Sequence, residues 1–158
     1  VRQMGLSQSV VGISWMAAVL AEMVFMLCSP RIIRRFPLGW LLILSYVTWG
    51  LRWYLMSVAG SPLPIVSVHL LHGITFGLYH PGAMNFLTKE VPSSLRNTGQ
   101  GLFSALSYGM GGIVGNLLSG IFFDSLGLVS LYRMAALVSV AAAVLFAVAL
   151  APRRRPAT

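Results

Sequence analysis

The chain has 158 residues, of which 57% are hydrophobic and only 9% are charged, and its formal net charge is +8. A typical soluble domain carries about 25% charged residues, so this composition excludes a soluble fold and predicts an integral membrane protein. The basic residues lie between and after the apolar runs, a distribution that argues against nucleic-acid binding in spite of the positive charge.

Long apolar runs predict five transmembrane helices, because about 20 apolar residues cross a bilayer as a helix and lipid offers the backbone no hydrogen-bond partners. The runs are separated by SPRIIRRFP, GSPLP, KEVPSSLRNT and DSLG. The predicted fold class is therefore an all-α membrane protein. The expected spans are residues 6–28, 38–59, 65–88, 100–123 and 131–150.

The basic residues between the spans predict the orientation, because Lys and Arg concentrate on the cytoplasmic side of a membrane protein. Eight follow the first, third and fifth spans, against two on the opposite side, so we expect the C-terminus in the cytoplasm and the N-terminus outside. The odd number of spans and a first residue other than methionine further predict a fragment of a longer protein. The eight are Arg31, Arg34, Arg35, Lys89, Arg96, Arg153, Arg154 and Arg155, and the two are Arg2 and Arg133.

Glu22 in the first span and Arg52 in the second are charged side chains in a segment that lipid should surround. Such a residue costs at least about 2.5 kcal/mol at a helix centre, so it usually faces the bundle interior or a watery cavity. One interpretation is a structural ion pair, and another is a pair that opens and re-forms during transport. Arg52 can also extend toward the outer interface.

All three histidines lie in the third span. His72 aligns with the polar face of that span, and a histidine can load and release a proton near neutral pH, so we predict that it binds solute or titrates. For His69 the favoured interpretation is a buried ring bonded to a backbone carbonyl. His80 precedes Pro81, which can kink the helix, and it is a candidate for satisfying that kink.

The histidines do not predict a metal site, because the three rings form no compact cluster on a straight helix and no second ligand-bearing segment completes one. No phosphate loop, nucleophile elbow or carboxylate pair is present. We therefore predict neither a cofactor nor an enzyme.

The fourth span combines polar and small residues. Gln100, Tyr108 and Asn116 are candidates for lining a cavity, whereas Gly111 and Gly115 favour close helix packing. The fifth span is apolar on every side, which predicts a peripheral, lipid-facing scaffold.

The layout of the chain resembles helices eight to twelve of the major facilitator superfamily. The segment GLSQSVVGISWMAAVLAEMVF is similar to the start of the eighth helix, and SPRIIRRFP to the basic loop after it, without the usual acidic residue. The segments LLHGITFGLYHPGAMNFL and GQGLFSALSYGMGGIVGNLLSGIFFDSLG resemble helices ten and eleven of the phenylpropionate-permease branch. That branch is related to the galactoside–proton symporters and, more distantly, to the nucleoside–proton symporters.

The resemblance implies roles for several side chains. Galactoside symporters depend on a carboxylate in helix eight, an arginine in helix nine and a His-x-x-Glu motif in helix ten, which Glu22, Arg52 and His72 resemble. Thr75 stands where that motif has its glutamate. The resemblance therefore assigns the coupling proton to no single residue, and Glu22, His72 or a group elsewhere remains open.

These observations predict an incomplete six-helix C-terminal bundle of a secondary transporter in a bacterial inner membrane, without its N-terminal bundle and one further helix. The expected activity is proton-coupled symport of a small polar or anionic organic solute, bound by Arg52 and His72 with Trp49, Tyr79 and Tyr108 as apolar surface. The alternative is a stand-alone membrane scaffold or subunit that binds partner helices without transport.

Overall fold

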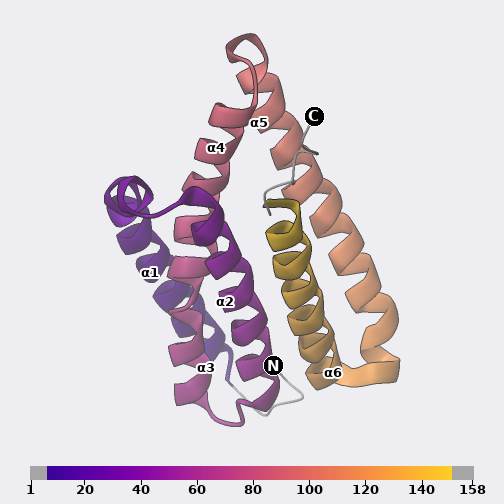
Figure 1. The fold of residues 1–158 in the computed structure, drawn as a ribbon. Helices are drawn as coiled ribbons and strands as arrows, with labels where there is room; N and C mark the ends of the chain where they lie inside the picture. Colours follow the sequence, from indigo (N-terminus) through magenta and orange to yellow (C-terminus); the bar gives the residue numbers. More distant parts are fainter. Residues whose placement is uncertain (1–6, 151–158) are drawn as a thin grey trace.

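The computed structural model describes residues 7–150, and all regular secondary structure in that range is helical (Figure 1). Four continuous helical stretches are long and apolar enough to cross a membrane. This confirms the predicted all-α membrane class. The elements are α1 (Gln8–Arg35), α2 (Leu38–Val58), α3 (Pro62–His69), the π-helical segment η2 (Gly73–Leu78), α4 (Tyr79–Glu90), the short 3-10 turn η3 (Ser93–Leu95), α5 (Arg96–Ser104), a second π-helical segment η4 (Ala105–Met110) and α6 (Gly111–Leu150).

The ends of the first helices follow from their prolines. The helix α1 continues across Pro30 to Arg35, beyond the predicted end of the first span at residue 28. It stops where Phe36 is extended, with φ −120° and ψ 145°, because Pro37 disfavours helical backbone in the residue before it. Pro62 begins α3 at a position where the missing N–H is not needed.

The third membrane-crossing rod is one stretch, Pro62–Glu90, built from α3, η2 and α4. Its middle widens into the π-helical turn Gly73–Leu78 just before Pro81. Proline lacks an N–H and its ring collides with the carbonyl four residues earlier, here that of Gly77. A π-helical turn at this place relieves the collision, and such turns are common at functional sites.

The helix α6 contains two arms that meet at Gly127, whose φ of 72° and ψ of 166° are not helical. Glycine is the residue that adopts this backbone without steric cost. Figure 1 shows the two arms turning back on each other at this point, so the fourth and fifth predicted spans are separate rods. The predicted break at DSLG contains this glycine.

Two glycines bring α1 against the third rod. A Cβ atom on Gly77 would lie 2.7 Å from the backbone oxygen of Glu22, and one on Gly73 would collide with the ring of Phe25. Only hydrogen fits at these positions, so the backbones of α1 and η2 approach closely. Because of this contact, Glu22 lies next to the third rod.

The second arm of α6 packs along α2 with one face, so the span predicted to be peripheral and lipid-facing also contacts protein. Ala136 and Ala143 are buried, and a Cβ atom on Gly50 would lie 3.3 Å from the backbone oxygen of Ala136. The opposite face, with Leu137 and Leu145 each 71% exposed, remains available to lipid. Small residues at helical spacing were the signal for this packing, although the arm beyond Arg133 is apolar on nearly every side.

The first arm of α6 has few neighbours in the described part of the chain. Added Cβ atoms on Gly112 and Gly115 would meet no heavy atom within 4 Å. The small residues of the fourth span therefore face open space within residues 7–150, rather than the close helix contact that their spacing favours.

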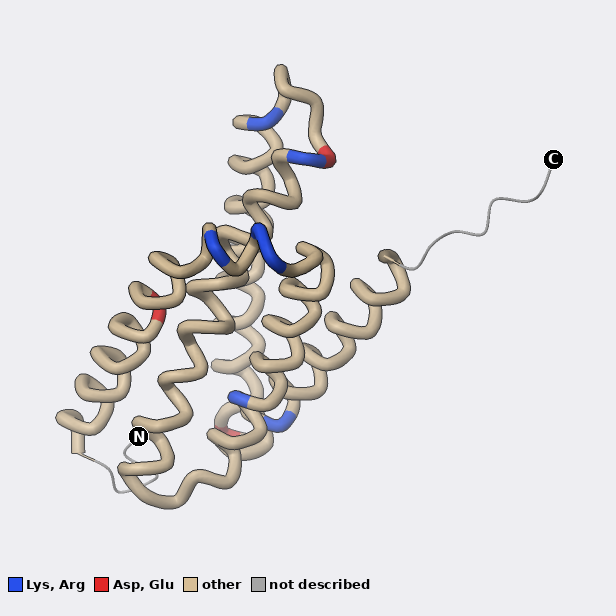
Figure 2. Tube along the Cα trace, turned by 60° about the vertical axis from the view of Figure 1, so that its left-hand side comes forward, with Lys and Arg blue, Asp and Glu red and all other residues tan. Residues whose placement is uncertain are grey.

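Basic residues gather at one end of the molecule, where α1 ends and where α4 turns into α5 (Figure 2). Arg34 and Arg35 lie in the last turn of α1, Lys89 lies in the last turn of α4 and Arg96 begins α5. Arg2 and the three arginines at 153–155, which also contributed to the predicted orientation, lie outside the described residues.

Candidate functional site

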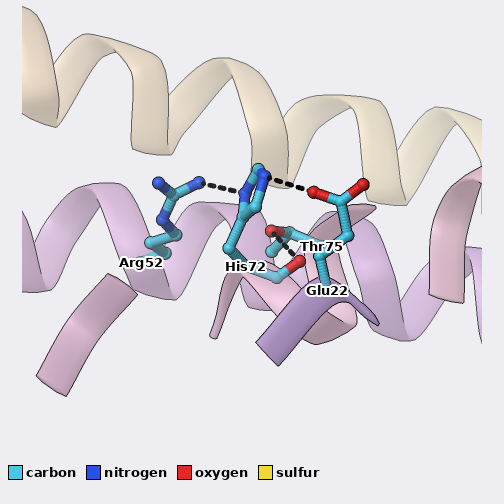
Figure 3. A network of polar contacts seen from close by, with 4 residues as sticks. All are labelled: Glu22, Arg52, His72 and Thr75. Atoms are coloured by element: carbon cyan, nitrogen blue, oxygen red, sulfur yellow. Dashed lines mark hydrogen bonds and ion pairs between the residues drawn. The ribbon is translucent and has the colours of Figure 1, made fainter. Parts of the chain in front are cut away.

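Three predicted site residues from three different helices form one polar network (Figure 3). Arg52 of α2 places Nη1 3.2 Å from Nδ1 of His72, the residue that precedes η2. On the other side of the ring, Nε2 lies 3.3 Å from a carboxylate oxygen of Glu22 in α1. Glu22 and Arg52 thus meet through His72 and not directly.

The chemistry of the guanidinium assigns the hydrogen on the His72 ring. Arginine only donates hydrogen bonds, so Nδ1 of His72 accepts from Arg52. The ring hydrogen then sits on Nε2 and is donated to Glu22, an assignment inferred from the network. His72 is therefore a neutral ring between a cation and an anion, and the three groups together carry no net charge.

Arg52 is held deep in the bundle, with only 5% of its surface exposed. Its guanidinium carbon lies 5.2 Å from the centre of the Trp53 ring, a cation–π distance. The buried Nε atom has no hydrogen-bond acceptor within residues 7–150. Arg52 therefore packs inside the protein.

Two further predicted residues, His69 and Thr75, lie on the third rod close to His72 in the sequence. His69 is 9% exposed, and its Nδ1 atom lies 2.8 Å from the Ile65 carbonyl oxygen, which is the packing arrangement favoured from the sequence. Thr75 is fully buried and donates from Oγ1 to the His72 carbonyl oxygen at 3.3 Å. Both side chains bond to the backbone of their own rod.

His80 and Tyr108 form a second polar contact, between the third and fourth spans. Nδ1 of His80 lies 2.9 Å from the Tyr108 hydroxyl. Phe76 lies between the His72 and His80 rings, with ring centres 5.6 and 5.8 Å away and nearly parallel planes. His80 thus bonds a neighbouring span, whereas the sequence suggested a role in satisfying the proline kink.

The other predicted residues lie away from the network. Tyr79 packs against Trp49, with ring centres 5.0 Å apart, and its hydroxyl meets that of Tyr46 at 3.3 Å. Gln100 donates to the Thr88 hydroxyl at 3.4 Å, near the basic end, and Asn116 is exposed on the first arm of α6.

A cavity of about 440 Å³ adjoins the network between the start of α1, the end of α2, α3 and the segment after Gly127. Trp53 and Met56 line it and were not predicted, although their spacing from Arg52 and Trp49 along one helix offered a signal. Tyr132 also lines it, and no pattern in the fifth span indicated this. The lining residues are Val10, Val11, Ser14, Trp15, Trp49, Arg52, Trp53, Met56, Ile65, His69, His72, Leu128 and Tyr132.

Similar proteins are transporters. The chain is 33% identical over 110 residues to the xanthosine permease of Escherichia coli K12, covering 66% of this chain and 26% of the permease. It is 30% identical over 106 residues to the nucleoside permease NupG of the same strain, and the match covers 64% of this chain and 25% of NupG. It is 29% identical over 124 residues to the "Probable 3-phenylpropionic acid transporter" of that strain, and this match covers 78% of this chain and 32% of the transporter. The chain thus spans about a quarter to a third of the length of these relatives.

A crystal structure of the nucleoside transporter NupG shares the fold, with a TM-score of 0.69 at 24% identity over 84% of this chain and 35% of that one. The relatives are permeases and transporters, which confirms the prediction that the chain is not an enzyme. The model of the "MFS_1 like family" matches residues 1–134, most of the chain. The chain therefore belongs to the MFS_1-like family of the major facilitator superfamily, whose members are integral membrane transporters.

Proposed function

We propose that this chain is part of a secondary active transporter that couples the uptake of a small polar or anionic organic solute to protons. The observation that carries the proposal is the Glu22–His72–Arg52 network, of which Arg52 and His72 line a cavity. Ionisable groups inside a membrane bundle mark substrate paths or proton relays by default. The relatives named above carry nucleosides, xanthosine or an aromatic acid according to their names.

The network provides a switch that a proton can operate. A proton that reaches Nδ1 of His72 removes the acceptor for Arg52, because the protonated nitrogen has no lone pair left to accept a hydrogen bond. The hydrogen bond between Arg52 on α2 and His72 on the third rod then breaks, whereas the existing contact with Glu22 becomes a full ion pair. Proton binding therefore removes one contact of the ring and strengthens the other.

The proposed architecture places solute near the bilayer midplane, between this bundle and an N-terminal bundle of the same protein, with rocking of the two halves giving alternating access. One further helix completes the six-helix bundle. The membrane is the bacterial inner membrane, with the C-terminus in the cytoplasm, as the distribution of basic residues favours.

Uptake by the native gene product in proteoliposomes tests this proposal, with uridine, xanthosine and 3-phenylpropionate as solutes and an inward proton gradient. Arg52→Ala and His72→Ala should abolish uptake while membrane insertion is retained. Arg133→Ala, a change at an exposed arginine, should behave like wild type. Wild-type uptake in both site variants would remove these residues from the mechanism, and no uptake in any form would favour the scaffold alternative.

A further inference from the structure

Within residues 7–150, Arg52 is a buried cation that has no carboxylate in direct contact. The network carboxylate of Glu22 contacts His72, and the guanidinium shares a hydrogen bond with Nδ1 of that ring. A guanidinium has five N–H donors, and in the described part of the chain Nε is buried without an acceptor. Because a buried charge is costly unless it is paired and hydrogen-bonded, Arg52 is prepared to receive an anion.

The wall of the cavity fits an anion with an apolar body. Arg52 lines it together with the rings of Trp15, Trp49, Trp53 and Tyr132, and no Asp, Glu, Asn or Gln is among its described lining residues. The other polar lining side chains are His72, which bonds Arg52, and Ser14 and His69, which bond backbone carbonyls of their own helices. A sugar or nucleoside would bring several hydroxyl groups that need such partners when buried. A carboxylate matches the fork of an arginine with two oxygens, and its apolar body can pack against the tryptophans.

Charge balance links this anion to a proton. The network itself consists of one positive, one neutral and one negative group, so its net charge is zero. An anion alone would make the site negative and a proton alone would make it positive, and both states are disfavoured where water is excluded. An anion and a proton together restore a net charge of zero.

Binding of the carboxylate and binding of the proton both depend on the hydrogen bond between Arg52 and His72. Nη1 of Arg52 donates to the lone pair of Nδ1, so His72 cannot be protonated there while that bond exists. A carboxylate that takes over donors of Arg52 releases Nδ1, which can then hold a proton and donate it to the same carboxylate. Nε2 keeps its contact with Glu22 throughout.

We propose that Arg52 and His72 form one site that binds a monovalent organic carboxylate with an apolar, aromatic body together with one proton, so that transport is electroneutral. This inference rests on the proposed function and narrows it. One proton from solution bonds to Nδ1, and no other bond is made or broken. The titratable and charged groups that face His72 or adjoin its network are Glu22 on α1, Arg52 on α2, His69 on α3, Tyr108 on η4 and Tyr132 on α6.

Calorimetric titration of the detergent-purified native gene product tests the inference with 3-phenylpropionate and its neutral amide, 3-phenylpropionamide. Titration in two buffers of different ionisation enthalpy gives the number of protons taken up, and we expect one per carboxylate bound. The amide should bind at least about 100-fold more weakly, because it offers the Arg52 guanidinium no carboxylate for a charge-assisted, two-oxygen contact.

Three variants separate the roles of the two residues. Arg52→Gln should lose carboxylate binding by a similar factor, while Arg52→Lys keeps the charge and should retain weaker binding with the uptake of one proton. His72→Asn should still bind the carboxylate, more weakly, with proton uptake close to zero. Size-exclusion profiles check that each variant is folded, and the lysine variant keeps the test decisive if the glutamine variant is not.

Uptake into proteoliposomes supplies the second measurement. A pH gradient should drive 3-phenylpropionate uptake, and a membrane potential imposed with potassium and valinomycin should not. Carboxylate binding without proton uptake, equal binding of the amide, or uptake driven by the potential alone would each overturn the inference. Proton-coupled uptake of uridine without binding of 3-phenylpropionate would overturn it while the proposed function stands, whereas no uptake of any solute would contradict the proposed function itself.

Discussion

The neutral ring of His72 connects a cation and an anion on two different helices, and each of its nitrogen atoms has one partner. The partners give the two nitrogens opposite roles, because Arg52 can only donate and the Glu22 carboxylate can only accept. A change at either partner should therefore affect one side of the ring while the other contact remains. Single substitutions of Arg52 and Glu22 can therefore test the contacts of the two ring nitrogens separately.

Glu22→Gln keeps an oxygen that can accept from Nε2 but removes the negative charge that offsets a protonated His72. A hydrogen bond to a charged group contributes about 1.5–3 kcal/mol, so we expect proton-driven uptake to fall at least about tenfold with insertion unchanged. Uptake rates in proteoliposomes measure this. Glu90→Gln, at the exposed end of α4, is the control, and equal loss in both variants would contradict the role of Glu22.

Tyr108→Phe removes the hydroxyl that bonds His80 and leaves the ring that packs near Phe76. The contact is exposed, so the free energy of unfolding should fall by only about 0.5–1.5 kcal/mol. The midpoint of thermal unfolding in detergent checks this. Tyr54→Phe, at a 54% exposed tyrosine, serves as the control, and a change that unfolds the protein would show that Tyr108 carries more than this bond.

At the scale of elements, the contact between α1 and η2 positions Glu22. Gly77 allows the close approach because a Cβ atom there would lie 2.7 Å from the Glu22 backbone oxygen. The π-helical turn and this contact occupy the same stretch of the third rod. The position of Glu22 therefore depends on the widened π-helical turn of the third rod and on the absence of a side chain at Gly77, where the rod meets α1.

Gly77→Ala should destabilise the protein by about 1–3 kcal/mol, because the added methyl group forces two backbones apart. Gly112→Ala should have the opposite sign, a gain of up to about 1 kcal/mol, because its Cβ meets nothing within 4 Å and alanine is the better helix former. Thermal unfolding midpoints of the two variants compare them directly. Midpoints shifted in the same direction would contradict the close contact.

For the whole molecule, the basic end defines the expected orientation in the membrane. Positive residues at the end of α1 and around the turn from α4 to α5 favour the cytoplasmic side. A green fluorescent protein fused to the C-terminus should fluoresce, and an alkaline phosphatase fused there should be inactive. Active phosphatase at that position would reverse the proposed orientation.

The proposed second bundle predicts the size of the native gene product. Its mass should exceed twice the 17.1 kDa of this chain, as measured by intact mass spectrometry of membranes from the source cell. A product near 17 kDa would contradict a two-bundle transporter made from one chain and would direct attention to a partner subunit.

The sequence by itself determined the membrane class and the candidate ionisable residues. Apolar length is a local property, and charged or histidine side chains inside a span stand out because lipid makes them costly. Glu22, Arg52 and His72 can therefore be recognised from their positions in the apolar runs alone. The break at DSLG can be recognised for a similar reason, because it contains the glycine that the turn requires.

Only the tertiary structure decided how these residues meet. The sequence left open whether Glu22 and Arg52 pair directly, and the ring of His72 connects them because Gly73 and Gly77 allow α1 to lie close against the third rod. The full set of residues that line the cavity could not be predicted. Tyr132 comes from the start of a mainly apolar span, and packing on α2 selects the buried face of that span. Apolar periodicity shows which residues avoid water, but in a membrane it does not separate a face that meets protein from a face that meets lipid.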